Sequence, residues 1–145
     1  MPNKNVKGND KKHSKNVIKV SNSTDCQTPL WSFGKVDNGG KFRFSQEDIN
    51  TELVIEKLIS LSTMTWSEIK KATHDKGKSK NHELNYEGIC AEGKDRIREK
   101  KLTEDADSIF SFALTNKIRL IGLKEGRVFY VIWYDPNHDF YPVNK

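Results

Sequence analysis

The sequence predicts an α+β fold with a mainly antiparallel sheet, and two observations lead to this prediction. The chain closes on two apolar segments, residues 109–123 and 128–134, that flank the short polar sequence "KEGR". Ahead of them lie two well-marked helix starts with apolar residues at helical spacing. Helices and strands that come in separate blocks are typical of α+β domains. We expect two or three helices and one domain over residues 29–145.

The N-terminal part differs in composition from the rest. Residues 1–28 are mostly Lys, Asn and Ser, with too few apolar side chains to bury. Because 31% of the whole chain is charged and only 34% is hydrophobic, we expect this part to be a disordered basic tail. The net charge of +5 makes a polyanionic partner plausible. The tail is open to two interpretations, a solubilising segment or a loose phosphate-binding arm.

A β-hairpin is predicted where order begins. Leu30, Trp31 and Phe33 alternate imperfectly with polar residues, and the turn sequence Asp37-Asn38-Gly39-Gly40 follows. The segment 42–44, "FRF", then supplies a second short apolar run. This order of strand, turn and strand is typical of a hairpin with one face on the core.

The first helix start is predicted at Ser45. This serine can cap the helix, and Phe44 and Ile49 flank it as a hydrophobic staple. Apolar residues then recur at helical spacing: Ile49, Leu53, Val54, Leu58 and Leu61.

The second helix start carries a complete capping box. Thr65 can accept a hydrogen bond from the third helical residue, Glu68, whose side chain can bond back. Met64 and Ile69 form the staple, and we expect Trp66 to anchor this short helix to the sheet. A polar loop over 74–83 and a third helix over about 87–101 complete the helical block.

The final hairpin is the clearest prediction. The segments 109–123 and 128–134 are apolar on both faces, which indicates central strands. Gly126 is placed to adopt the positive φ of the turn. Antiparallel pairing across this turn is expected to place Lys117 beside Tyr134 and Arg119 near Ile132.

Several functional classes leave no signature in the sequence. No phosphate-binding glycine loop and no serine-triad motif is present, and the histidines are not spaced as metal ligands. We therefore expect no metal and no other cofactor. Cys26 and Cys90 form no disulfide framework, and no run approaches the roughly 20 apolar residues of a membrane span. With no signal-peptide core behind the N-terminal lysines, these features indicate a cytoplasmic protein without a membrane partner.

A basic and aromatic set of residues around the final hairpin is the candidate site. Cations there can bind phosphate oxygens, tyrosine can stack on a base, and histidine can move a proton at neutral pH. The candidate catalytic residues are Arg119, Tyr134, Asp135 and His138, and the candidate nucleic-acid-binding residues are Lys117, Lys124 and Arg127. The sequence Asp135-Pro136-Asn137-His138 is equally open to interpretation as a simple polar turn, in which His138 has no chemical role.

The segment 116–142, "NKIRLIGLKEGRVFYVIWYDPNHDFYP", resembles the closing part of the RelE/ParE toxin superfamily. The shared order is an arginine-bearing strand, a short acidic-glycine turn, an aromatic-aliphatic strand and a histidine tail. The resemblance implies a metal-independent endoribonuclease that cuts mRNA on the ribosome and is controlled by an antitoxin protein. It makes Arg119 the strand arginine and His138 the tail residue, with Lys117 and Arg127 as weaker matches.

Two further sequence features bear on this interpretation. The segments "LWSF", "MTWSEI" and "WYDPNH" resemble a group of small bacterial proteins to which no function is assigned. The RelE/ParE toxins also lack an Asp-Pro-x-His element of this form. A toxin-like RNA-cleaving or RNA-binding protein of a bacterial toxin-antitoxin or phage-defence system is therefore one hypothesis. A non-catalytic nucleic-acid- or protein-binding module is the other.

Overall fold

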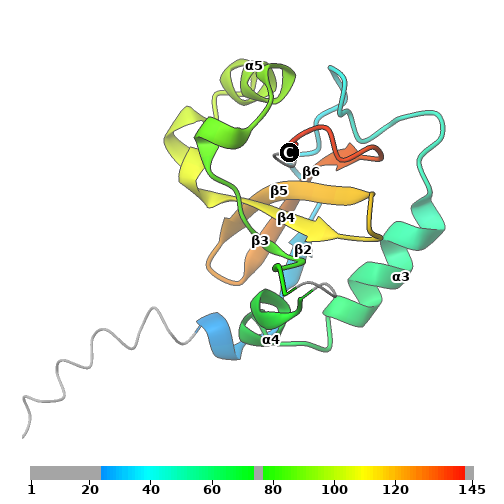
Figure 1. Cartoon of the computed structure of the whole chain (residues 1–145), viewed down its shortest axis with the longest axis vertical. Helices are drawn as coiled ribbons and strands as arrows, with labels where there is room; N and C mark the ends of the chain where they lie inside the picture. Colours follow the sequence, from blue (N-terminus) through cyan, green and yellow to red (C-terminus); the bar gives the residue numbers. More distant parts are fainter. Residues whose placement is uncertain (1–23, 74–76, 143–145) are drawn as a thin grey trace, which may run out of the picture.

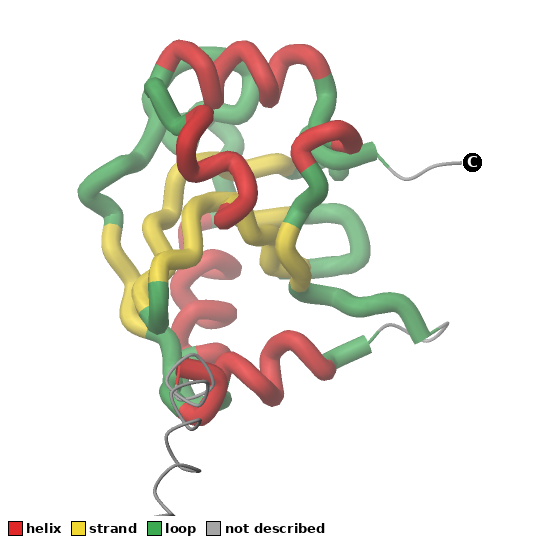
Figure 2. Tube along the Cα trace, turned by 90° about the vertical axis from the view of Figure 1, so that its left-hand side faces the viewer, coloured by secondary structure: helices red, strands yellow, loops and turns green. Residues whose placement is uncertain are grey.

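The computed structural model describes residues 24–73 and 77–142 and has the predicted α+β fold. A mixed sheet lies between two groups of helices (Figures 1 and 2). The strands are β2 (Leu30–Ser32), β3 (His82–Glu83), β4 (Ile109–Ala113), β5 (Arg119–Glu125) and β6 (Val128–Asp135). The helices are α3 (Thr51–Leu61), α4 (Trp66–Lys71) and α5 (Ala91–Glu99), with short 3₁₀ segments η3 (Thr24–Cys26), η4 (Tyr86–Gly88) and η5 (Thr103–Ser108).

The strand order is β2-β6-β5-β4-β3, and the pairing is antiparallel except between β2 and β6. The predicted N-terminal hairpin is therefore wrong. Leu30 pairs with Val128 in parallel, while the later Arg43 forms an isolated bridge to Trp133 on the same strand β6. The physical reason lies in the intervening turn, where Asp37 bonds to groups outside it and draws the chain across β6.

The predicted strand over 109–123 is divided into β4 and β5. A turn interrupts it, in which the Leu114 N–H donates to the Ile118 carbonyl at 2.9 Å and the Thr115 hydroxyl accepts from the Ile118 N–H at 2.9 Å. Threonine in a short polar stretch commonly makes such local bonds to the backbone. The positive φ predicted for Gly126 is confirmed at 61°, but the turn is shorter than predicted because Lys124 and Glu125 belong to β5.

The register predicted for β5 and β6 is wrong, because the pairing starts with Glu125 opposite Val128 and a β-bulge then adds one further residue. Arg119 lies opposite Asp135, and Ile121 opposite Trp133, yet Gly122 lies opposite Val131. Ile132 is therefore the extra residue of the bulge. Ile132 and Trp133 both pack in the same core cluster, so the alternation of side chains reverses after this point.

Two apolar cores lie on opposite faces of the sheet. On one face, α3 and α4 pack against residues of β4, β5 and β6, and on the other face lies the cluster that contains α5. Figure 2 shows the same arrangement of helix, sheet and helix. Apolar residues on both faces of the central strands, as the sequence predicted, supply these two cores.

The capping box at α4 is confirmed. Thr65 accepts from the Glu68 N–H, and the Glu68 carboxylate accepts from the Thr65 N–H. Trp66 has no exposed surface, and its indole N–H donates to the Arg127 carbonyl at 3.1 Å. This helix is therefore anchored to the sheet as expected.

The other two helix predictions need correction at their starts. Helix α3 begins at Thr51, since Asn50 rather than Ser45 is the N-cap and accepts from the Leu53 N–H at 2.9 Å. The predicted helix over 87–101 is a 3₁₀ turn followed by the shorter α5, which Cys90 caps. An Asn at the N-cap is as favourable as Ser, so local sequence did not decide between them.

The predicted disordered tail covers residues 1–28, of which 1–23 lie outside the described residues. Residues 24–28 are packed against the domain instead of being disordered. The Gln27 carbonyl accepts from the Trp66 N–H at 2.9 Å, and the Thr28 carbonyl accepts from Arg127 at 2.9 Å. The ordered part therefore includes residues 24–28.

Candidate functional site

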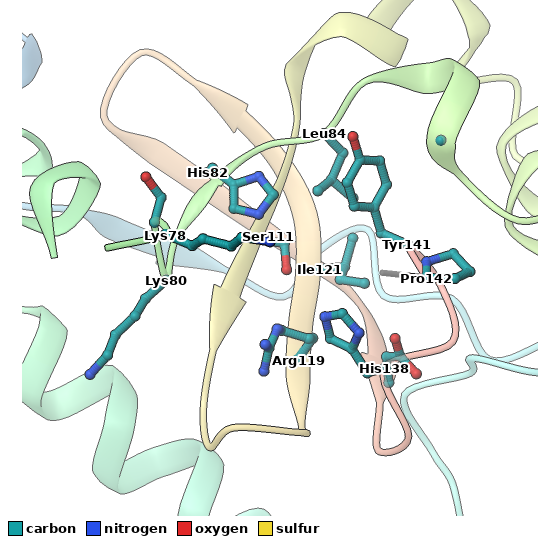
Figure 3. Close-up of a pocket in the computed structure, with 13 residues that line it drawn as sticks. Lys78, Lys80, His82, Leu84, Ser111, Arg119, Ile121, His138, Tyr141 and Pro142 are labelled. Atoms are coloured by element: carbon teal, nitrogen blue, oxygen red, sulfur yellow. The ribbon is translucent and has the colours of Figure 1, made fainter. Parts of the chain in front are cut away.

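A pocket of about 410 Å³ lies on the face of the sheet that also carries the α5 cluster (Figure 3). A volume of this size falls in the range of small-molecule sites. Its lining comes from strands β3 to β6 and from the loops beside them: Lys78, Ser79, Lys80, His82, Leu84, Gly88, Ser111, Arg119, Ile121, Asp135, His138, Tyr141 and Pro142.

The floor of the pocket is built from neighbouring positions of the sheet. His82 on β3 lies opposite Ser111 on β4, and Ser111 lies opposite Ile121 on β5. Arg119 is two residues before Ile121, so its side chain leaves the same face of β5. Cross-strand neighbours on one face lie about 5 Å apart at Cβ, which brings the polar groups of these strands within reach of one ligand.

The sequence after β6 forms both a turn and part of the pocket. Asp135 is 1% exposed, and its carboxylate accepts from the Asp139 N–H at 3.0 Å and from the Phe140 N–H at 2.8 Å. His138 adopts φ 60°, a left-handed conformation that is uncommon outside glycine. The turn that Asp135 holds in this way places the His138 ring beside Arg119 (Figure 3).

Arg119 brings a positive charge to the pocket. One terminal nitrogen, Nη1, donates to the Thr115 carbonyl at 2.7 Å and to the Ile118 carbonyl at 3.2 Å. Among the described residues, no hydrogen-bond acceptor is placed for its Nε and Nη2 groups. Burial lowers the pKa of Arg119 and nearby Asp135 partly offsets this, but a guanidinium stays charged at neutral pH. Two of its donor nitrogens are thus left for a ligand.

The electrostatic surroundings of His138 favour its neutral form. Burial lowers the pKa of His138 first, the charge of Arg119 lowers it further, and His82 adds to the same effect. Asp135 and Asp139 act in the opposite direction without cancelling the shift. At neutral pH the His138 imidazole can therefore accept a proton.

His82 is a pocket residue that the sequence did not predict, because it lies in the segment assigned to a polar loop. Its Nδ1 lies 3.0 Å from the Glu83 carbonyl oxygen, and this bond requires the proton on Nδ1. Nε2 is then the ring nitrogen left for a ligand. Asn81 fixes this segment, since its amide donates to the Ile69 carbonyl and its oxygen accepts from the Ala113 N–H. Such long-range bonds leave no signal in the local sequence.

The lysines around the pocket were also missed by the sequence interpretation. Lys78 and Lys80 line the pocket from the loop before β3. Figure 3 shows Lys80 extending away from the two histidines. These lysines add positive charge at one side of the pocket.

Two predicted site residues lie away from this pocket. Tyr134 is 1% exposed and packs in the core on the opposite face, because the bulge reverses the side-chain alternation. Its hydroxyl accepts from the Asn50 N–H at 3.4 Å. Lys117 is exposed in the turn between β4 and β5, so its predicted pairing beside Tyr134 is wrong, and Leu120 takes that place. Neither side chain lines the pocket.

The remaining predicted cations lie near the β5–β6 turn, away from the pocket. Lys124 donates to the Gly126 carbonyl at 3.0 Å, and its ammonium lies 4.7 Å from the centroid of the Trp66 ring. Burial and nearby Lys70 lower the pKa of Lys124. Arg127 donates to both the carbonyl and the hydroxyl of Thr28. Of the seven predicted residues, the structure therefore brings together Arg119, Asp135 and His138.

No family model, curated protein or solved structure matches this chain. Over residues 24–73 and 77–142, no group of three His, Cys, Asp or Glu side chains is arranged to hold a metal ion. In the same ranges, no helix combines the length and the apolar character that crossing a membrane requires.

Proposed function

We propose that this protein cleaves RNA by metal-independent transesterification in the pocket of His82, Arg119 and His138. The observation that carries the proposal is the presence of two histidines and a partly unpaired arginine around one cavity. Acid–base groups beside a fixed positive charge are what phosphodiester cleavage requires.

The reaction would proceed by attack of the ribose 2′-hydroxyl on the adjacent phosphorus. His138, neutral at pH 7, accepts the proton of that hydroxyl as the new P–O bond forms. His82 gives a proton from Nε2 to the departing 5′-oxygen, so the products are a 2′,3′-cyclic phosphate and a free 5′-hydroxyl. Arg119 stabilises the negative charge that gathers on the non-bridging oxygens. After one turnover His138 has gained a proton and His82 has lost one. Proton exchange with water then restores both side chains.

The resemblance to the RelE/ParE toxins supports the same residues from the sequence side. Its strand arginine corresponds to Arg119 and its tail residue to His138, and both line the pocket. His82 lies outside the resembling segment and joins them through the β3–β4 pairing. On this proposal the substrate is mRNA, free or on the ribosome, the protein acts in the cytoplasm, and an antitoxin protein controls it.

The test combines purified-protein cleavage with a growth assay. A fluorescently labelled single-stranded RNA is incubated with the full chain in EDTA, beside variants His82→Gln, Arg119→Gln and His138→Gln. We expect each variant to cut about 10²–10⁴-fold more slowly and to relieve any growth arrest on expression. Lys117→Gln is the matched control, since this cation lies outside the pocket on the neighbouring turn. Undiminished cleavage by His138→Gln would contradict the mechanism.

The net charge and the lysines near the pocket favour a second candidate, a non-catalytic nucleic-acid-binding module. On that alternative no variant and no wild-type protein cuts RNA. Binding instead persists in His138→Gln and weakens steeply as salt rises, because phosphate contacts release counterions. A substrate with a single 2′-deoxyribose at the cut site separates the two further, because transesterification needs the 2′-hydroxyl while binding does not.

A further inference from the structure

Ser111 carries a hydroxyl into the floor of the pocket without a protein partner. The residue is 5% exposed, and no hydrogen bond joins its Oγ to any described residue. Figure 3 shows this oxygen directed into the space between His82, Ile121 and Arg119. Most buried hydroxyls in folded proteins are hydrogen-bonded, so an unpaired one inside a pocket indicates a ligand that completes it.

Two side chains near Ser111 in the pocket are hydrogen-bond donors. His82 lies directly opposite on β3, and Arg119 projects from the same sheet face on β5 with Nε and Nη2 left for a ligand. An acceptor above Ser111 would therefore meet a hydroxyl, a guanidinium and an imidazole on different sides. A tetrahedral oxyanion has an oxygen for each of these directions, which a planar carboxylate does not.

We propose that Ser111 and Arg119 together form an oxyanion subsite for phosphate. In it the Ser111 hydroxyl donates to the non-bridging oxygen that Arg119 also holds. The inference rests on the proposed function, since it makes Ser111 a catalytic residue that touches the scissile phosphate. It assigns Ser111 the role of donor rather than nucleophile, because the ribose 2′-hydroxyl is the nucleophile of the proposed cleavage.

Orthophosphate is the probe that tests this subsite, with affinity measured by isothermal titration on the full chain at low salt. We expect Ser111→Ala to weaken phosphate binding about tenfold or more, because bonds to charged groups are the stronger ones. Ser111→Cys keeps nearly the same shape but has a weaker donor, so its phosphate affinity should lie between those of wild type and Ser111→Ala. Ser60→Ala is the matched control, because it removes an exposed hydroxyl of α3 that lies outside the pocket, and should change the affinity less than twofold.

A second measurement separates ligand binding from a structural role. Removing an unpaired buried hydroxyl relieves a cost of folding, so Ser111→Ala should have an equal or higher Tm than wild type without phosphate. Added phosphate should raise the Tm of wild type and leave the variant nearly unchanged. A lower Tm of Ser111→Ala with unchanged phosphate affinity would show that the hydroxyl serves the fold, and would overturn the inference.

The RNA-cleavage assay distinguishes failure of the phosphate subsite from failure of the proposed RNA cleavage. Cleavage by wild type that is matched by Ser111→Ala overturns the subsite and leaves the proposed function standing. Phosphate binding that depends on Ser111, without RNA cleavage, supports the subsite and overturns the proposed function. A wild-type protein that neither binds phosphate nor cuts RNA overturns both.

Discussion

Loss of Asp37 should destabilise the fold and test how the loop after β2 is held to the rest of the domain. The residue is 2% exposed and accepts hydrogen bonds from the Gly39 N–H at 3.0 Å, from Arg96 Nε and Nη2 at 3.0 Å each, and from the Trp133 indole at 2.8 Å. These bonds join the loop after β2, helix α5 and strand β6. Asp37→Ala would leave the donors of all three without an acceptor.

The expected loss of unfolding free energy is about 3–5 kcal/mol, the range for breaking a buried ion pair by removing one partner. The Arg96 side chain keeps 24% of its surface exposed, so water can restore part of its hydration and lower its share. The indole of Trp133 cannot recover in this way because the residue has no exposed surface. That unpaired N–H alone costs about 1–3 kcal/mol.

Urea denaturation followed by tryptophan fluorescence measures this loss. Asp95→Ala is the matched control, because it removes a carboxylate of α5 that pairs with Arg98 on the exposed surface. A surface pair of that kind is worth about 0–1 kcal/mol. If Asp37→Ala costs no more than Asp95→Ala, the ion pair does not hold the loop to α5, and our account of the failed hairpin prediction fails with it.

The same carboxylate predicts how stability changes with pH. Burial alone would raise the pKa of Asp37, but the bonds from Arg96, Gly39 and Trp133 outweigh it and hold the pKa below its ordinary value. The stabilisation is therefore complete above the unfolded pKa of about 3.9 and is lost as pH falls through the folded pKa. Asp37→Asn should be less stable at neutral pH and should show a smaller loss of stability below pH ~4 than wild type.

Three further outcomes follow from the packing and charges. Trp66→Ala should lower the unfolding free energy by about 3–5 kcal/mol, and Trp66→Phe by less, since the buried ring is mostly kept. Gly122→Ala should lower the urea midpoint severely, because a Cβ there would lie 1.8 Å from a backbone carbonyl oxygen of β6. By NMR titration, the pKa of His138 should rise in Arg119→Gln and fall in Asp139→Asn, since these charges lower and raise it respectively. Shifts in the reverse directions would show that the ring does not face these groups.

Local signals predicted the parts of the fold that local bonds determine. The prediction of a capping box at Thr65 is confirmed, and it was possible because both hydrogen bonds join residues that are only three positions apart. The β5–β6 turn was equally clear because Gly126 supplies the positive φ it needs. The partner of β2 could not be predicted, since Leu30 pairs with Val128 almost a hundred positions later and in parallel. Nothing in a three-residue strand specifies such a partner.

The candidate site also combines residues that the local sequence could associate with residues that only distant strand pairing brings in. Arg119 and His138 belong to one continuous segment, so the sequence could associate them. His82 and Ser111 reach the pocket through the pairing of β3 with β4, and β3 is a strand of two residues in a polar stretch. His82 lies in a stretch with no periodic pattern, and Ser111 lies in a segment that was predicted to be a central strand but carries no local signal of a pocket. Sequence reasoning therefore recovered one side of the pocket and missed the other.

The bulge at Ile132 explains why the sequence misjudged the end of β6. Without it, strict alternation from Phe129 and Val131 would place Asp135 on the face of α3 and α4. With the extra residue, Tyr134 takes that face and Asp135 reaches the pocket. The catalytic role predicted for Tyr134 therefore loses its structural basis.

The turn predicted after Asp135 is confirmed, while the chemical role of His138 stays a prediction. Both carboxylate oxygens accept backbone N–H groups of the turn. The charge of Asp135 also acts on the His138 ring by raising its pKa, against the larger lowering by burial and Arg119. Asp135 is thus a positioning residue, since the turn it closes holds His138 in a left-handed conformation beside Arg119. The polar turn is the structure that builds this side of the pocket.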